Sequence, residues 1–124
     1  MIRVLLGDDN DTLREALAEA LEDHPSIAVV GHARNGRSTV EAAAALQPDV
    51  VVMDIRMPIM PGPDATAMIF EACPATRVVG LTAHDDDALH DAMLRAGAVA
   101  VLVKGASIDL IVATIERAAG GGAR

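Results

Sequence analysis

Short runs of aliphatic residues alternate along this chain with longer stretches in which apolar residues recur at helical spacing. The short runs predict strands at residues 2–6, 27–30, 50–53, 77–81 and 100–103. A helix is predicted after each strand, the last one with Ser107 as its N-cap. The apolar stripes of these helices are Leu13, Leu17, Ala20 and Leu21; Val40, Ala43 and Ala44; residues 65–73; Ala88, Leu89, Ala92, Met93 and Ala96; and Ile108, Ile111, Val112 and Ile115.

The alternation of strand and helix predicts the fold class. Repeated βα units favour a parallel sheet with helices on both faces, and right-handed crossovers leave few topologies. Residues 50–53 are apolar throughout, as in a strand buried on both faces. We predict a doubly wound α/β fold with a five-stranded parallel sheet in the order 2-1-3-4-5. In this order the chain reverses direction between strands one and three, where ligands usually bind at the carboxyl ends of strands.

Composition sets the size of the core and the class of partner. With 124 residues the chain is the size of one domain, which we place at residues 1–119, with a Gly-rich tail or linker at 120–124. Phe70 is the only aromatic residue, so the core must be aliphatic. A net charge of −8 argues against direct nucleic-acid binding. The single cysteine and the lack of a signal peptide or an apolar run of about 20 residues predict a cytoplasmic protein without a membrane contact.

Polar residues follow four of the predicted strands. Asp8 and Asp9 follow the first strand, Asp54 ends the third, Thr82 follows the fourth and Lys104 follows the fifth. Because strands one and three are neighbours in the predicted order, the three carboxylates would repel one another unless they share a cation. Magnesium takes oxygen ligands and needs only one or two protein carboxylates beside a phosphate. Asp9 and Asp54 suit direct ligation.

This constellation suits phosphoryl transfer. A carboxylate oxygen of Asp54 is placed to attack phosphorus and form an acyl phosphate. Lys104 and the Thr82 hydroxyl would contact the other phosphoryl oxygens, so positioning and charge neutralisation would do most of the catalysis. Taken singly, Thr82 fits equally well as an ordinary hydroxyl at a strand end, and Lys104 as a solvated charge.

The motifs at the strand ends resemble those of a known family over essentially the whole chain. They are the Asp8-Asp9 pair, the segment Asp54-Ile-Arg-Met-Pro58 followed by Gly62, the Thr82-Ala83 pair, and Lys104. Together they resemble the receiver domains of two-component response regulators, which have a flavodoxin-like fold. The stretch at residues 29–36 is similar to the subgroup that usually carries a C-terminal LuxR/NarL-type helix-turn-helix domain.

The resemblance implies a role for each site residue. Asp54 would accept a phosphoryl group from a sensor histidine kinase in a reaction that depends on Mg²⁺ or Mn²⁺. Asp9 would be a direct metal ligand, Asp8 a ligand through water, and the main-chain carbonyl of Arg56 a third protein ligand. The groups implied to contact the phosphoryl oxygens are Thr82 and Lys104.

The resemblance also implies the output and the partners. Phosphorylation would change an output surface and control transcription through a C-terminal DNA-binding domain that this sequence does not contain. Homodimerisation is compatible with the subgroup, although no heptad forces it. The only chemistry expected is self-phosphorylation and self-dephosphorylation, so we do not predict a turnover enzyme. An aspartate-dependent phosphatase would need a second acid where Arg56 stands, and no nucleotide-binding glycine loop is present.

Two positions bear on the output and on the lifetime of the phosphate. Val101, three residues before Lys104, stands where the family usually has Tyr or Phe as a switch that reports phosphorylation. His84 follows Thr82 by two residues, and we hypothesise that His84 and the Arg56 side chain tune phosphate lifetime; an exposed loop histidine is the alternative. Val101 also leaves open a second function, that of a phosphorylation-independent pseudo-receiver acting as a protein-binding module.

The acidic residues also have purely structural interpretations. Asp9 or Asp11 could cap the first helix, and Thr12 with Glu15 fits a capping box. Asp54 has no helix starting directly after it, because a proline-rich connection intervenes, so capping does not explain an acid at the end of an apolar strand.

Overall fold

The computed structural model describes residues 1–83 and 87–120 of the chain. It alternates strand and helix as predicted. The strands are β1 (Ile2–Gly7), β2 (Ile27–Ala33), β3 (Val50–Asp54), β4 (Arg77–Thr82) and β5 (Ala100–Val103). The helices are α1 (Asp11–Glu22), α2 (Gly36–Leu46), α3 (Gly62–Ala72), α4 (Asp87–Ala96) and α5 (Ile108–Ala119).

The strands form one parallel sheet in the order β2-β1-β3-β4-β5, so the predicted fold class and strand order are confirmed. The register brings the carboxyl ends of the strands to one level. Gly7 pairs with Met53, and Thr82 pairs with Val103. Side chains that follow β1, β3, β4 and β5 therefore start from the same edge of the sheet.

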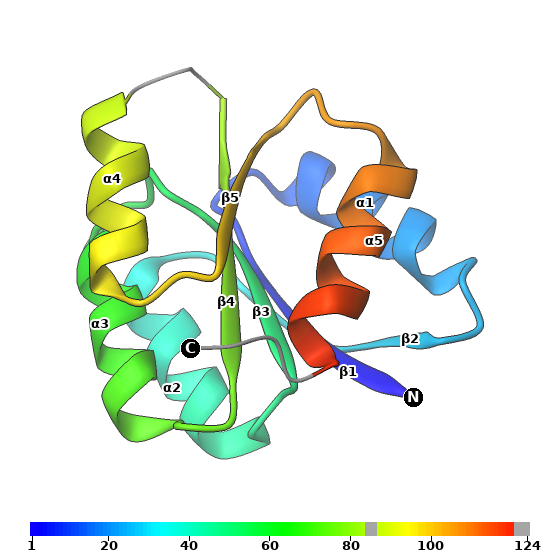
Figure 1. Cartoon of the computed structure of the whole chain (residues 1–124), viewed down its shortest axis with the longest axis horizontal. Helices are drawn as coiled ribbons and strands as arrows, with labels where there is room; N and C mark the ends of the chain where they lie inside the picture. Colours follow the sequence, from blue (N-terminus) through cyan, green and yellow to red (C-terminus); the bar gives the residue numbers. More distant parts are fainter. Residues whose placement is uncertain (84–86, 121–124) are drawn as a thin grey trace.

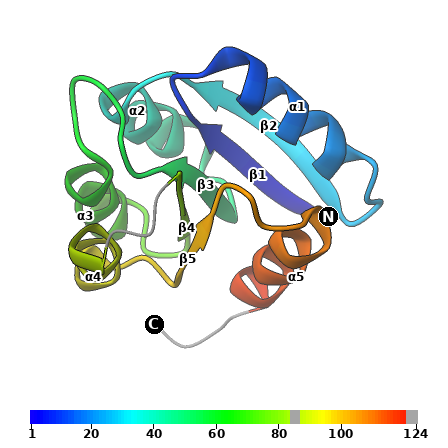
Figure 2. The same ribbon diagram turned by 90° about the horizontal axis from the view of Figure 1, so that it is seen from above.

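Helices cover both faces of the sheet (Figures 1 and 2). α1 and α5 lie on one face, and α2, α3 and α4 lie on the other. Alternate residues of β1 divide between the two cores: Val4 and Leu6 pack on the side of α1 and α5, and Leu5 packs on the opposite side. Both cores are aliphatic, and Phe70 is 42% exposed. Within residues 1–83 and 87–120, no helix is long and apolar enough to cross a membrane.

The helix ends agree with the sequence at α5 but not at α1. Ser107 caps α5 as predicted, and its side chain accepts a hydrogen bond from the Leu110 N–H. The alternative interpretation, in which Asp9, Asp11 or a capping box of Thr12 and Glu15 caps α1, is wrong. The cap is Asn10, whose extended backbone lets its side-chain oxygen accept from the Leu13 N–H at 3.1 Å.

Two elements extend three residues beyond their predicted bounds, and β1, β3 and β4 are each one residue longer than predicted. β2 continues three residues further, to Ala33, because its pairing with β1 runs on to Gly7. α3 begins at Gly62 instead of residue 65, with Pro63 in its first turn. A proline fits there because the first turn of a helix leaves its N–H groups without partners in the helix.

The loop between β3 and α3 closes tightly on itself. The Gly62 N–H donates to the Ile55 carbonyl at 2.8 Å. A side chain at Gly62 would place its Cβ 2.7 Å from that oxygen, so only glycine fits. Within the same loop Ile59 has a φ of 74° and is 72% exposed. A β-branched residue in the left-handed region is strained.

Replacing Ile59 with Gly should therefore stabilise the protein. Left-handed backbone costs an L-residue roughly 1–2 kcal/mol, whereas glycine adopts it freely at an entropic cost of roughly 0.5–1 kcal/mol. We expect the free energy of unfolding to rise by about 0.5–1 kcal/mol. Urea unfolding followed by circular dichroism suits a chain whose only aromatic residue is Phe70.

The matched control introduces glycine where the backbone is already helical. Ala16 is exposed within α1, and Ala16→Gly should lower the free energy of unfolding by about 1 kcal/mol. Destabilisation by both substitutions would show that Ile59 carries no strain.

Candidate functional site

Three carboxylates meet at the carboxyl edge of the sheet. Asp8 and Asp9 follow β1, and Asp54 is the last residue of β3. One carboxylate oxygen from each lies within 4.8 Å of the others. Asp8 and Asp54 are buried and Asp9 is exposed. Sequence reasoning predicted this juxtaposition from the strand order alone.

Lys104 joins the two buried carboxylates. Its Nζ lies 3.0 Å from Asp8 Oδ2 and 3.1 Å from Asp54 Oδ2, and 22% of its side chain is exposed. Burial alone would lower the pKa of Lys104, but the hydrogen bonds and charges of Asp8 and Asp54 outweigh it and raise that pKa above its usual value. Lys104 therefore stays charged and partly neutralises the cluster.

Each buried carboxylate uses its second oxygen to hold the loop that follows it. Asp8 Oδ1 accepts from the Asn10 N–H at 2.9 Å, and Asp54 Oδ1 accepts from the Arg56 N–H at 3.2 Å. Aspartates often bond the backbone two residues further on in this way. The two Oδ2 atoms are thereby turned toward Lys104.

One positive charge does not fully compensate Asp54. Burial disfavours its charged form and raises its pKa, and the nearby charge of Asp8 acts in the same direction. The hydrogen bond and charge of Lys104 and the Arg56 N–H lower that pKa, but by less. A further positive charge beside the cluster would therefore stabilise the ionised form of Asp54.

The donor set fits a hard divalent cation. All three side chains offer carboxylate oxygens, the ligands that Mg²⁺ prefers, and Asp9 is exposed to solvent. Three acids also leave a net negative charge beside Lys104, which a cation would neutralise.

Thr82 and Arg56 also lie at this edge of the sheet. Thr82 ends β4 and is 5% exposed, and its carbonyl accepts from the Lys104 N–H at 2.7 Å. β4 is therefore tied to the residue that bridges the two buried acids. The Arg56 side chain is exposed, two residues after Asp54.

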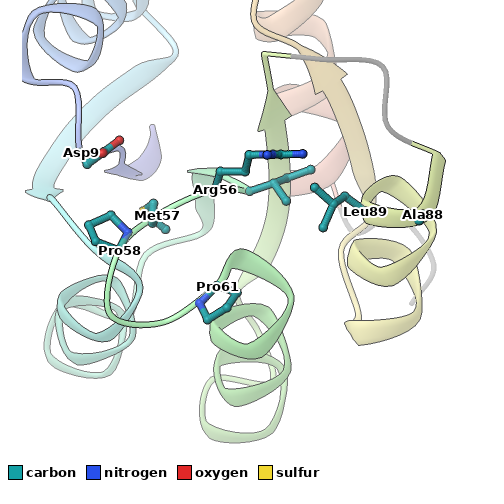
Figure 3. A pocket seen from close by; sticks show the side chains of 8 residues that line it. Asp9, Arg56, Met57, Pro58, Pro61, Ala88 and Leu89 are labelled. Carbon is teal, nitrogen blue, oxygen red and sulfur yellow. The ribbon is translucent and has the colours of Figure 1, made fainter.

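A groove of about 800 Å³ borders the acidic cluster. Figure 3 shows Asp9 on one rim and Ala88 and Leu89 of α4 on the other, with Arg56 between them. The remaining lining residues are Ile55, Met57, Pro58 and Pro61. Asp9 therefore borders an open groove that reaches α4.

The sequence and the structure of this chain match one family. The family of response regulator receiver domains matches residues 4–116. The chain belongs to this family. The signal receiver domain of the response regulator NarL from Mycobacterium tuberculosis aligns with a TM-score of 0.91 and 36% identity, over 97% of each chain. The predicted likeness to LuxR- and NarL-type regulators is confirmed.

Two curated relatives are longer proteins with different names, and each matches this chain over part of its length. Transcriptional regulatory protein LnrK from Bacillus subtilis (strain 168) is 39% identical over 122 residues, 98% of this chain and 56% of LnrK. Protein-glutamate methylesterase/protein-glutamine glutaminase 4 from Myxococcus xanthus is 43% identical over 104 residues, 83% of this chain and 30% of that protein. The receiver domain thus spans about half the length of LnrK and less of the esterase.

The two positions singled out for output and lifetime have different outcomes. Val101 is half-buried and packs against the core cluster that contains Met93 of α4. His84 lies outside the described residues. The proposed tuning of phosphate lifetime by His84 and Arg56 stays a prediction.

Sequence reasoning missed Arg14. Arg14 is 7% exposed, and its Nη1 donates to the Asp8 carbonyl at 2.7 Å. The signal was present, because Arg14 precedes Ala18 by four residues and Leu21 by seven on the buried face of α1.

Replacing Asp54 with Asn should stabilise the receiver domain when divalent metal is absent. The folded pKa of Asp54 is raised, so stability is lost as the pH rises from its ordinary pKa of 3.8 through the folded value. Urea unfolding in EDTA should show the variant more stable than the native protein at neutral pH. The difference should shrink below pH 3.8, where both states are protonated.

An exposed acid supplies a control for which replacement by Asn should change the free energy of unfolding in the opposite direction. Asp109 lies in the first turn of α5, where a negative charge is favourable. Asp109→Asn should lower the free energy of unfolding by about 0.3–1 kcal/mol. Equal stability of the native and Asp54→Asn proteins at every pH would contradict the electrostatic strain assigned to Asp54.

Proposed function

We propose that this receiver domain accepts a phosphoryl group on Asp54 from a sensor histidine kinase, in a reaction that requires Mg²⁺ or Mn²⁺. The observation that carries the proposal is the cluster of three carboxylates with Lys104 bonded to Asp54 itself. Asp9 and Asp54 would hold the metal directly, Asp8 through water, and Arg56 through its main-chain carbonyl. When bound, the metal supplies positive charge to the phosphoryl oxygens.

The chemistry on Asp54 is a single displacement at phosphorus. A carboxylate oxygen of Asp54 forms the new P–O bond while the P–N bond to the donor imidazole breaks, and the imidazole nitrogen keeps the electron pair. Lys104, already 3.1 Å from Asp54 Oδ2, is placed to pair with a phosphoryl oxygen, and the Thr82 hydroxyl is proposed to bond another. The raised pKa of Asp54 makes its free carboxylate a stronger base.

The proposed role is that of a signalling switch. We place the protein in the cytoplasm and expect it not to turn over an external substrate. The chain spans about half of LnrK, whose name describes a transcriptional regulator. We propose that phosphorylation changes an output surface of the domain and that any contact with DNA is made by a further C-terminal domain. Homodimerisation of the receiver domain is part of this proposal.

Intact-protein mass after incubation with acetyl phosphate tests the chemistry. With Mg²⁺ present, the native protein should gain the mass of one phosphoryl group, and neither the Asp54→Asn variant nor the metal-free native protein should gain it. Asp9→Asn should slow the reaction by about tenfold or more at limiting Mg²⁺, as loss of a metal ligand would.

Asp109→Asn, which changes an exposed acid on α5, should react like the native protein. A gain that persists in Asp54→Asn would place the acceptor elsewhere. No gain by the native protein under any condition would reject the proposal and favour the pseudo-receiver, a binding module that works without phosphate.

A further inference from the structure

A buried arginine connects three elements beside the acidic cluster. Arg14 of α1 donates from Nη1 to the Asp8 carbonyl at 2.7 Å and from Nε to His32 Nδ1 on β2 at 3.0 Å. The same Nη1 lies 2.8 Å from Asp11 Oδ1 in the first turn of α1. One side chain therefore ties the end of β1 to β2 and α1.

The bond to the Asp8 carbonyl acts on the next residue. A peptide group is planar, so the oxygen of Asp8, the nitrogen of Asp9 and the Cα of Asp9 share one plane. A hydrogen bond to that oxygen limits rotation of the peptide plane. It therefore restricts the position of the Asp9 Cα and the direction of the Asp9 side chain.

Two further hydrogen bonds of Asp8 fix the turn that contains Asp9. The Asp8 N–H donates to the Ala33 carbonyl at 3.0 Å, and Asp8 Oδ1 accepts from the Asn10 N–H at 2.9 Å. These bonds hold residues on both sides of Asp9. The peptide plane that enters Asp9 is held by Arg14.

We propose that Arg14 is a positioning residue for the metal site, which aims the Asp9 carboxylate by holding the carbonyl of Asp8. The inference rests on the proposed function, because it concerns the metal that phosphoryl transfer requires. Arg14 touches neither the phosphoryl group nor the metal in this scheme.

Charge and geometry predict opposite effects of removing Arg14. A guanidinium near the acidic cluster repels a divalent cation, so loss of its charge alone would tighten Mg²⁺ binding. Loss of positioning would weaken Mg²⁺ binding, by about tenfold for a residue that orients a ligand. A role in stability alone would leave the Mg²⁺ affinity of the folded protein unchanged.

Calorimetric titration of Mg²⁺ into the metal-free protein separates these cases without any phosphodonor. The variants are Arg14→Met, which keeps the apolar stem, and Arg14→Lys, which keeps the charge but cannot span both the Asp8 carbonyl and His32. Arg34→Met is the matched control, since Arg34 Nε lies 3.1 Å from Asp11 Oδ1 and the Arg34 side chain is 70% exposed. Circular dichroism sets a temperature at which every variant is folded.

We expect the Kd for Mg²⁺ to rise about tenfold in Arg14→Met and by less in Arg14→Lys, and not to rise in Arg34→Met. An unchanged or lower Kd in Arg14→Met overturns the positioning role and leaves the proposed function intact. If Arg14→Met does not fold, Arg14→Lys decides, and a native Kd there overturns the inference. Failure of the native protein to bind Mg²⁺ would reject the proposed function itself.

Discussion

Two buried carboxylates bonded to one lysine ammonium group set the electrostatic character of this molecule. The parallel sheet brings Asp8 and Asp54 to adjacent strand ends, where burial removes hydration from each carboxylate. One backbone N–H bonds the Oδ1 of each, and Lys104 supplies a positive charge to both Oδ2 atoms. Burial raises the pKa of Asp54 even with that ammonium group in contact. A site in this condition favours any ligand that adds positive charge, which a divalent metal does.

The fold around this cluster keeps the acids from moving apart. Aliphatic packing on both faces fixes the strands, and the level register fixes where each strand ends. The loops then add short bonds of their own: Asn10 to Asp8, Arg56 to Asp54, and Gly62 to Ile55. The left-handed Ile59 shows that closure of the β3–α3 loop is maintained against local backbone preference.

The sequence predicted features that depend on repeating patterns. Strand order, the two-sided burial of residues 50–53 and the meeting of Asp8, Asp9 and Asp54 all follow from the period of the apolar residues and the handedness of crossovers. It did not predict which of several adjacent polar residues caps α1. Asn10 takes that place because backbone angles decide it, and composition does not distinguish Asn10 from Asp9 or Asp11. Arg14 was missed because a charged side chain on a buried helix face is rare unless it has partners.

Val101 limits how this receiver domain can transmit a signal. Its side chain packs in the aliphatic core beside Met93, and valine has a single rotatable side-chain bond. Rotation of this bond therefore cannot move the valine side chain between a buried and an exposed position as far as it would move the ring of a Tyr or Phe. Valine also lacks the hydroxyl that a Tyr would present at the surface. A change in the position of Val101 must then come from movement of the backbone of β5. Met93 is the buried residue of α4. Its sulfur accepts a hydrogen bond from the Thr66 hydroxyl of α3 at 3.5 Å, so a movement of α4 would change the contact between α4 and α3.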